Sequence, residues 1–212
     1  MEANLNTVEI RILGSLMEKA LSTPDYYPLS LNALLSACNQ KSSRDPVVTY
    51  DAPTVQAALE DLEAKGLVDC SRLGRVPKFE ELFGRRHDLM PPELAALAVL
   101  FLRGPQTAGE VRSRTARLHR FTGLEAVLET LDRLTEWGLC HRLARLPGHK
   151  EDRYAHRLGD PDGAKEMAVQ VEAETTAPEA VRRIETLEQA VASLRAELAA
   201  LRADFRDFKS QF

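Results

Sequence analysis

Hydrophobic residues recur at intervals of three and four in the first part of the chain, which is the spacing of helices with one buried face. A first helix is predicted after Asn6, which can form a capping box with Glu9, and a second from about Ser30. A third ends at a glycine cap in residues 59–67, where the pattern changes to that of a strand. A basic turn containing Gly and Pro follows at 74–78. The pattern predicts three helices and a two-stranded ribbon.

The same pattern returns further along the chain. Residues 59–67 (LEDLEAKGL) align with 131–139 (LDRLTEWGL) at an offset of 72. Upstream of the second copy, Pro91-Pro92 opens a helix, and capping boxes are expected to begin at Thr107 and Thr122. The repeat therefore predicts the same small unit twice.

Three helices followed by a ribbon are the order of a winged helix, a variant of the helix-turn-helix motif. The predicted class is mainly α with small β-hairpins (α+β), as two tandem winged-helix domains and a C-terminal helix resembling a coiled coil. Units of this size are marginal alone, so we expect them to pack together. The expected domains are 1–84 and 85–158, then a linker at 159–178 and a heptad helix at 179–212.

Beyond the linker, apolar residues alternate at intervals of three and four from Ile184 onward, which is a heptad seam. In a parallel pair of helices, Glu197 would face Arg202, and Asp204 would face Lys209. The simplest antiparallel register would bring like charges together. The tail predicts a parallel homodimer, with a helix folded back on its own chain as the alternative. The seam residues expected at the dimer contact are Ile184, Leu187, Val191, Leu194, Leu198, Leu201, Phe205 and Phe208.

The composition, with 44% hydrophobic and 28% charged residues, is that of a globular protein. The sequence has no apolar run of transmembrane length and no secretory signal at its start, so no membrane association is expected. The three cysteines are too widely spaced for a disulfide framework or a zinc finger. These features favour a cytoplasmic location.

Positive charge gathers in the middle of the chain, although the formal net charge is −4. Residues 91–158 hold 11 Lys and Arg against 8 Asp and Glu, whereas both flanking regions are acidic. Cations on a helix and a neighbouring ribbon could contact DNA phosphates; the alternative is a solvated basic face. The candidate nucleic-acid-binding residues are Lys41, Arg44, Arg112, Arg114, Arg117, Arg120, Arg142, His149, Lys150 and Arg153.

The expected third helices argue against sequence-specific readout of DNA. Their N-terminal halves contain no Arg, Lys or Asn, and only Gln56 could read a base edge, while Glu125 would repel phosphate. Acidic third helices also suit a protein-binding winged helix. An adaptor for protein partners is therefore the alternative function.

A polar stretch, ACNQKSSRDP at 37–46, separates the second and third helices of the first unit. Its donors could bind an anion near the third helix: Asn39, Gln40, Lys41, Ser42, Ser43 and Arg44. Alternatively, Asn39 and Arg44 could pin the loop through backbone carbonyls or hold the two units together.

The sequence carries no recognisable catalytic motif, so no enzyme activity is expected. His141 and His156 could lie nearly opposite each other across the second ribbon. Histidines beside a core are more often satisfied there than bound to metal. We expect no metal, no cofactor and no small-molecule ligand.

Three segments resemble the bacterial YceH-like family, a family of unknown function: YYPLSLNALLSACNQKSSRDPV, LRGPQTAGEVRSRTARL and LPGHKEDRYAHRL. The resemblance covers roughly residues 8–158. It implies tandem winged-helix domains and no particular chemistry. Together with the charge pattern, it favours a regulator-like protein that binds DNA and dimerises through its tail.

Overall fold

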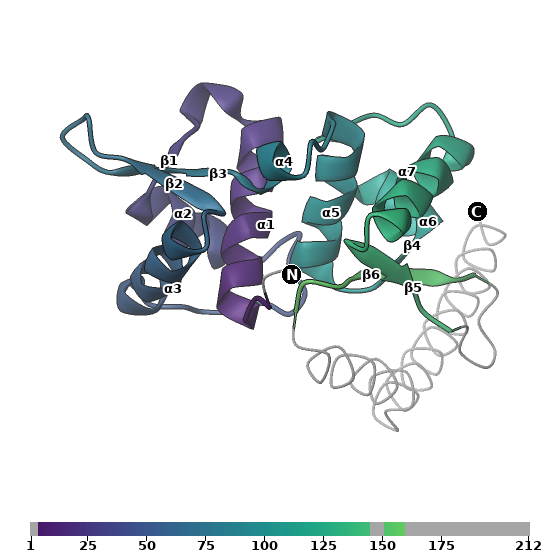
Figure 1. Ribbon diagram of the computed structural model, residues 1–212, viewed down its shortest axis with the longest axis horizontal. Coiled ribbons are helices and arrows are strands. Elements are labelled where there is room, and N and C mark those ends of the chain that lie inside the picture. The colour runs from purple at the N-terminus through teal and green to yellow at the C-terminus, as the bar shows by residue number, and fades with distance from the viewer. Residues whose placement is uncertain (1–3, 145–150, 160–212) are drawn as a thin grey trace, which may run out of the picture. The chain divides into compact units, whose positions relative to one another are not determined.

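The computed structural model describes residues 4–144 and 151–159, a unit of mixed α+β structure (Figure 1). This described part contains seven α-helices and two small antiparallel sheets. The heptad tail that the sequence predicts, and most of the linker before it, lie outside the described residues. None of the helices described is long and apolar enough to cross a membrane.

The first half of the unit consists of three main helices and a small sheet. Its elements are α1 (Thr7–Ser22), a 3₁₀ turn (Pro24–Tyr26), β1 (Leu29–Ser30), α2 (Leu31–Cys38), α3 (Ala52–Ala64), β2 (Val68–Ser71) and β3 (Lys78–Glu81). The short helix α4 (Phe83–Arg86) leads out of it.

The second half repeats this order of elements. It contains α5 (Pro91–Arg103), β4 (Gln106–Thr107), α6 (Ala108–Arg114), α7 (Leu124–Glu136), β5 (Cys140–Arg142) and β6 (Arg153–His156). The strand orders are equivalent, β1-β3-β2 and β4-β6-β5. The topology of the first half therefore recurs in the second.

Each sheet has three strands, whereas the sequence predicted two-stranded ribbons. The additional strands β1 and β4 pair through Leu29 with Phe79 and through Gln106 with Tyr154. Each is only two residues long, so it leaves no alternating pattern of polar and apolar residues in the sequence. The prediction is wrong in its strand count for that reason.

Two of the three predicted capping boxes are confirmed. Asn6 caps α1 together with Glu9, and Thr107 caps α6. The box predicted at Thr122 is wrong, because α7 begins one residue later, with Gly123 as an N-cap that offers no side-chain bond. The N–H groups of the first turn of α7 are therefore left without a side-chain cap.

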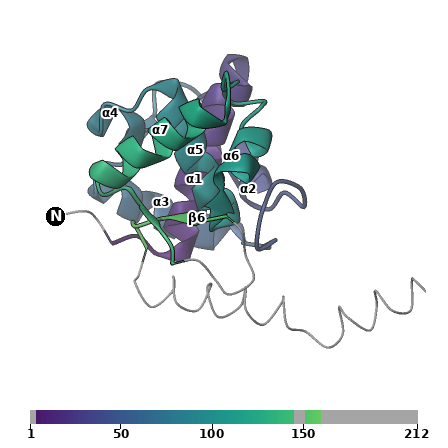
Figure 2. The ribbon, with the colours of Figure 1, turned by 90° about the vertical axis from the view of Figure 1, so that its right-hand side faces the viewer.

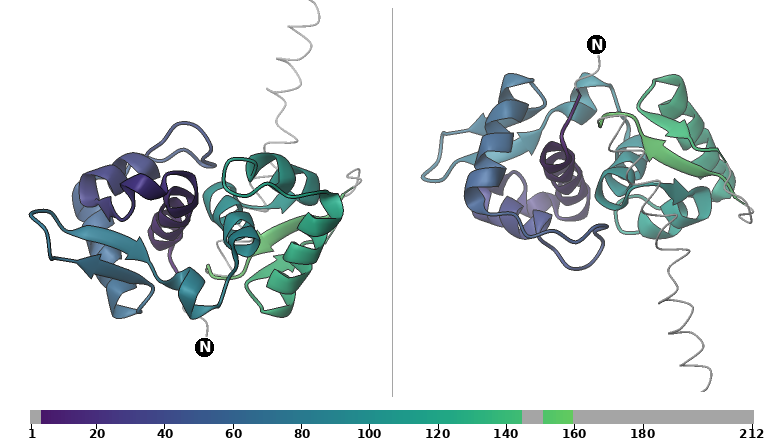
Figure 3. Two further views of the ribbon diagram at one scale, coloured as in Figure 1. Left: turned by 90° about the horizontal axis from the view of Figure 1, so that it is seen from above. Right: turned by 90° about the horizontal axis from the view of Figure 1, so that it is seen from below.

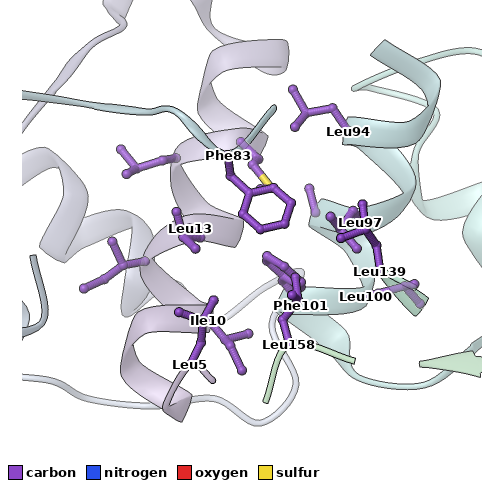
Figure 4. Close-up of a cluster of buried hydrophobic side chains, with 14 of the residues drawn as sticks. Leu5, Ile10, Leu13, Phe83, Leu94, Leu97, Leu100, Phe101, Leu139 and Leu158 are labelled. Carbon is purple, nitrogen blue, oxygen red and sulfur yellow. The ribbon is translucent and has the colours of Figure 1, made fainter. Parts of the chain in front are cut away.

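The hydrophobic core runs from one half into the other where α1 packs against α5. Figure 4 shows Ile10 and Leu13 of α1 on one side and Leu97 and Phe101 of α5 on the other, with Phe83 between the two helices. The crossing is close because α1 carries a glycine at the contact. A Cβ added at Gly14 would lie 2.8 Å from Phe101 Cβ.

The ends of the described chain also meet. The Leu5 N–H donates to Leu158 O at 2.8 Å, and Leu5 bridges Gly159 in parallel. Leu5 precedes the first half in the sequence, but its backbone bonds to residues at the end of the second half. This contact adds a backbone link to the shared core.

Candidate nucleic-acid interface

Arg44 lies at the centre of the polar loop, where its side chain is completely buried. Its guanidinium makes a two-pronged ion pair with Glu18 of α1, with Nη2–Oε2 at 2.6 Å and Nη1–Oε1 at 3.1 Å. Nε and Nη2 also donate to Ala37 O at the end of α2, at 3.1 and 2.9 Å. Arg44 is therefore committed to internal bonds and does not face solvent.

Asn39 holds the same loop through its side-chain amide. Its Nδ2 donates to Tyr50 O, and its Oδ1 accepts from the Tyr50 N–H, both at 2.8 Å. Arg11 supports the loop from α1, donating from Nη2 to Pro46 O at 2.7 Å. These contacts match the alternative in which Asn39 and Arg44 pin the loop. The sequence analysis missed Arg11, although an arginine among the apolar residues of a helix is a signal for a buried bond.

The loop also touches the second half of the molecule. The Asp45 N–H donates to Leu102 O of α5 at 2.8 Å. Figure 3 shows the segment between α2 and α3 reaching toward the half that contains α5. Lys41, Ser42 and Ser43 remain exposed at its tip, and Gln40 is half-buried. Of the loop's two cations, only Lys41 is available at the surface.

Cations gather on α6 and on the segment that follows it. Arg112, Arg117 and Arg120 are exposed and make no ion pair within the part of the chain that the structure describes. Arg114 is half-buried, and its Nη2 lies 3.4 Å from Glu110 Oε1. Figure 2 shows α6 on the same side of the molecule as α2 and the loop after it. This region is exposed and positively charged.

Arg103, at the end of α5, belongs to the same group of charges, and the sequence analysis missed it. Burial lowers the pKa of its guanidinium, and the nearby positive charges of Arg114 and Arg44 lower it further. Arg103 therefore lies within electrostatic reach of Arg114 on α6 and of the buried Arg44–Glu18 pair. We call this group the α6 cation cluster, and its members are Arg103, Arg112, Arg114, Arg117 and Arg120.

The cations of the second sheet are largely neutralised. Arg142 forms an ion pair with Asp152 across the hairpin. Arg153 donates from Nη1 to Pro105 O at 2.9 Å and to Glu110 Oε2 at 3.1 Å. His149 and Lys150, at the expected tip of this hairpin, lie outside the described residues. The described part of the sheet therefore offers less free positive charge than its sequence indicates.

The third helices present little that could read bases. Gln56 of α3 is occupied within its own helix, where its Nε2 donates to Glu60 Oε1 at 3.0 Å. The outer face of α7 is acidic, and its four exposed carboxylates are Glu125, Glu129, Asp132 and Glu136. Among the described residues none of the four makes an ion pair. Carboxylates repel phosphate, so this face does not suit DNA.

His141 and His156 lie on neighbouring strands but not directly opposite each other. The register pairs His156 with Cys140 and His141 with Ala155, so the two histidines are offset by one position and lie on opposite faces of the sheet. The His156 ring packs edge-on against Phe101 at 5.1 Å, and its burial lowers its pKa to about 4. The described residues contain no group of three potential metal ligands. The Nδ1 atoms of both histidines are buried and have no hydrogen-bond partner among the described residues, so the expectation that these rings are satisfied beside the core is wrong.

Comparison with known proteins finds a family and close relatives. The family described as "Protein of unknown function, DUF480" matches residues 5–149. A "UPF0502 protein" of Solibacter usitatus is 46% identical over 214 residues, which cover all of both chains. A "UPF0502 protein" of Pelobacter propionicus is 50% identical over 219 residues, again over the whole of both chains. One of Pseudomonas fluorescens is 41% identical over 201 residues and covers 93% of each chain. These matches confirm the expected resemblance to a bacterial family of unknown function.

Proposed function

The chain belongs to the DUF480 family, and we propose that it binds duplex DNA through the phosphate backbone, as a regulator-like protein with tandem winged-helix domains. The recurring order of helices and strands supports the winged-helix assignment, because both halves combine three helices with a terminal hairpin. This assignment places α6 and α7 in the positions of the helix-turn-helix pair.

The observation that carries the proposal is the α6 cation cluster. Arg112, Arg117 and Arg120 are exposed and free of carboxylate partners among the described residues. Such cations gain affinity for DNA by releasing the counterions condensed on the phosphates. The cluster therefore suits a run of phosphates.

The acidic face of α7 limits how the DNA can lie. In a winged helix the third helix usually enters the major groove. Glu125 and Glu129 on the exposed face of α7 would meet phosphates and base acceptors there. We therefore propose binding that depends on charge and shape, with α6 and the segment after it against the backbone. Contacts of this kind position a protein without reading sequence.

The heptad seam at the C-terminal end is proposed to pair two chains. Its residues lie outside the described part of the chain, so this step is supported by the sequence pattern alone. Pairing would bring two α6 cation clusters to one duplex and raise the affinity by joining two sites.

Fluorescence anisotropy with a labelled duplex at low salt tests the proposal. The full-length protein should bind and lose affinity steeply as salt rises. The triple variant Arg112→Glu, Arg117→Glu and Arg120→Glu should abolish binding. The charge-matched control is Arg75→Glu, Lys78→Glu and Arg85→Glu, which alters exposed cations at the β2–β3 hairpin and α4. Figure 1 places that hairpin at the opposite end of the unit from α6, so the control should bind normally.

The alternative function, an adaptor for protein partners, makes a different prediction for the same assay. An adaptor would leave the anisotropy of the labelled duplex unchanged even at low salt, because it would not bind DNA. A wild-type chain that does not bind, or a control variant that loses as much affinity as the test variant, would refute the DNA proposal.

A further inference from the structure

The outer face of α7 combines exposed aliphatic residues with carboxylates. Leu124 is 45% exposed and Leu128 is 37% exposed, one turn apart. Beside them run Glu125, Glu129, Asp132 and Glu136, spaced four, three and four residues apart, so that they form one stripe along the helix. We call these six residues the α7 face.

This arrangement opposes the stability of the isolated helix. Like charges three and four residues apart destabilise a helix by a few tenths of a kcal/mol per pair. The nearby Arg133 does not relieve them, because it pairs with Glu93 at 2.6 Å. Within the described residues no carboxylate of the α7 face forms an ion pair, and a second nearby cation, Arg142, is paired with Asp152. A partner surface that carries both cations and apolar side chains could pair with the carboxylates of the α7 face and cover its two leucines.

The turn of the first hairpin has the complementary features. Residues 72–78 (RLGRVPK) are all exposed, and Leu73 is 100% exposed. Arg75 and Lys78 make no ion pair with any described residue, and Arg72 is held 3.3 Å from Glu63. Val76 is also exposed. This segment, the hairpin turn, therefore presents two aliphatic side chains among three cations.

We infer that the hairpin turn of one copy docks on the α7 face of a second copy. Leu73 and Val76 would cover Leu124 and Leu128, while the cations would lie against the carboxylate stripe. Complementary charges of this kind set orientation and association rate, and aliphatic contact adds burial. A contact of this size gives weak association.

The contact cannot form within one chain. Figures 1 and 3 both show the β2–β3 hairpin at one end of the unit and α7 at the other. Two different surfaces therefore meet, and association is head-to-tail. Head-to-tail contacts can continue from one copy to the next, so they form open chains of protomers. The heptad seam of the tail, in contrast, is expected to form a closed dimer.

Sedimentation velocity of the full-length protein over a concentration series tests the inference. At low salt the average sedimentation coefficient should rise with concentration beyond the value set by the tail, and at about 0.5 M salt the rise should be lost, because exposed charges are then screened. The apolar seam of the tail should respond little to salt. A wild-type chain that shows no salt-sensitive growth would overturn the inference.

Charge reversal makes the test specific. Here growth means the salt-sensitive rise of the average sedimentation coefficient with protein concentration. Arg75→Glu with Lys78→Glu should abolish growth, and so should Glu129→Lys with Asp132→Lys. An equimolar mixture of the two double variants should grow again, because each reversed surface meets its opposite. Leu73→Ser should weaken growth without changing charge. Growth that persists in either double variant, or a mixture that stays at the baseline, would exclude this contact. The Arg75→Glu, Lys78→Glu variant leaves both the α6 cation cluster and α7 unchanged, so DNA binding measured on that sample separates this inference from the proposed function.

Discussion

Gly14 offers a direct test of the shared core. It lies where α1 crosses α5, and an added Cβ would approach Phe101 Cβ to 2.8 Å and Leu102 Cγ to 3.0 Å. The first of these atoms is fixed to the backbone of α5 and cannot rotate away. Gly14→Ala therefore requires the two helices to separate, which would disturb the contact that joins the two halves.

Two opposing terms set the size of the effect. An extra methyl group in a well-packed core costs about 1–3 kcal/mol. Alanine is favoured over glycine inside a helix by about 1 kcal/mol. Because the close neighbour of Gly14 is a backbone-anchored atom, we expect a packing cost near the top of its range. The net loss in the free energy of unfolding should be about 1–2 kcal/mol.

Gly109 provides a matched control, because it is exposed on α6 and an added Cβ would come no closer than 3.9 Å to its neighbours. Gly109→Ala should stabilise by up to about 1 kcal/mol. Urea unfolding followed by the fluorescence of Trp137, the single tryptophan of the chain, measures both variants. Trp137 lies in the second half and Gly14 in the first, so a shifted midpoint for Gly14→Ala reports the coupling itself. An unchanged or raised midpoint for that variant, with Gly109→Ala behaving as expected, would refute the shared core.

Other predictions concern single side chains. Arg44→Met should lower the free energy of unfolding by about 3 kcal/mol, because it leaves Glu18 with only the longer 3.7 Å contact to Lys19 Nζ and leaves Ala37 O without its two donors. Lys41→Met should change it by less than about 0.5 kcal/mol, and equal effects of the two variants in urea titrations would contradict the buried role of Arg44. The pKa of His156 is lowered to about 4, so the unfolded chain binds the proton first as the pH falls. Burial, with a smaller contribution from the charge of His141, disfavours the protonated imidazole in the folded chain. Stability should therefore drop by up to about 3 kcal/mol between pH 6.5 and pH 4, and a drop of the same size in His156→Leu would contradict this assignment. Asn6→Ala should lower the melting temperature through a loss of about 1 kcal/mol at the cap of α1; an unaltered melting temperature would count against the capping box.

Local signals in the sequence predicted most of the elements. The cap at Asn6, the proline start of α5 and the glycines after α3 and α7 are properties of adjacent residues, and the structure contains them. Gly66 and Gly138 adopt positive φ, as a helix-terminating glycine does. Short strands such as β1 were not predicted, because they form by pairing with residues far along the chain.

The availability of charged side chains could not be predicted in the same way. The sequence shows Arg44, Arg142 and Arg153 as cations, but the carboxylates that engage them come from other elements, such as Glu18 and Glu110. Arg103 joins the α6 cation cluster only because α5 ends beside α6 and the loop after α2. Counting basic residues in the sequence therefore overstates the positive charge available to DNA at the loop and at the second sheet. At α6 the same count understates it, because Arg103 is left out.

The number of free cations determines how DNA binding should respond to salt. If Arg112, Arg117 and Arg120 each neutralise one phosphate, affinity should fall about 40-fold between 50 and 200 mM salt, with a log–log slope near about −2.7. Two clusters on one duplex, joined through the tail, should double that slope and give a fall of about 2,000-fold. Anisotropy titrations of the full-length chain and of a variant with charged residues at Leu194 and Leu198 should therefore differ twofold in slope. Equal slopes would mean that the heptad seam does not bring two clusters to the same DNA, whatever its effect on the mass of the protein.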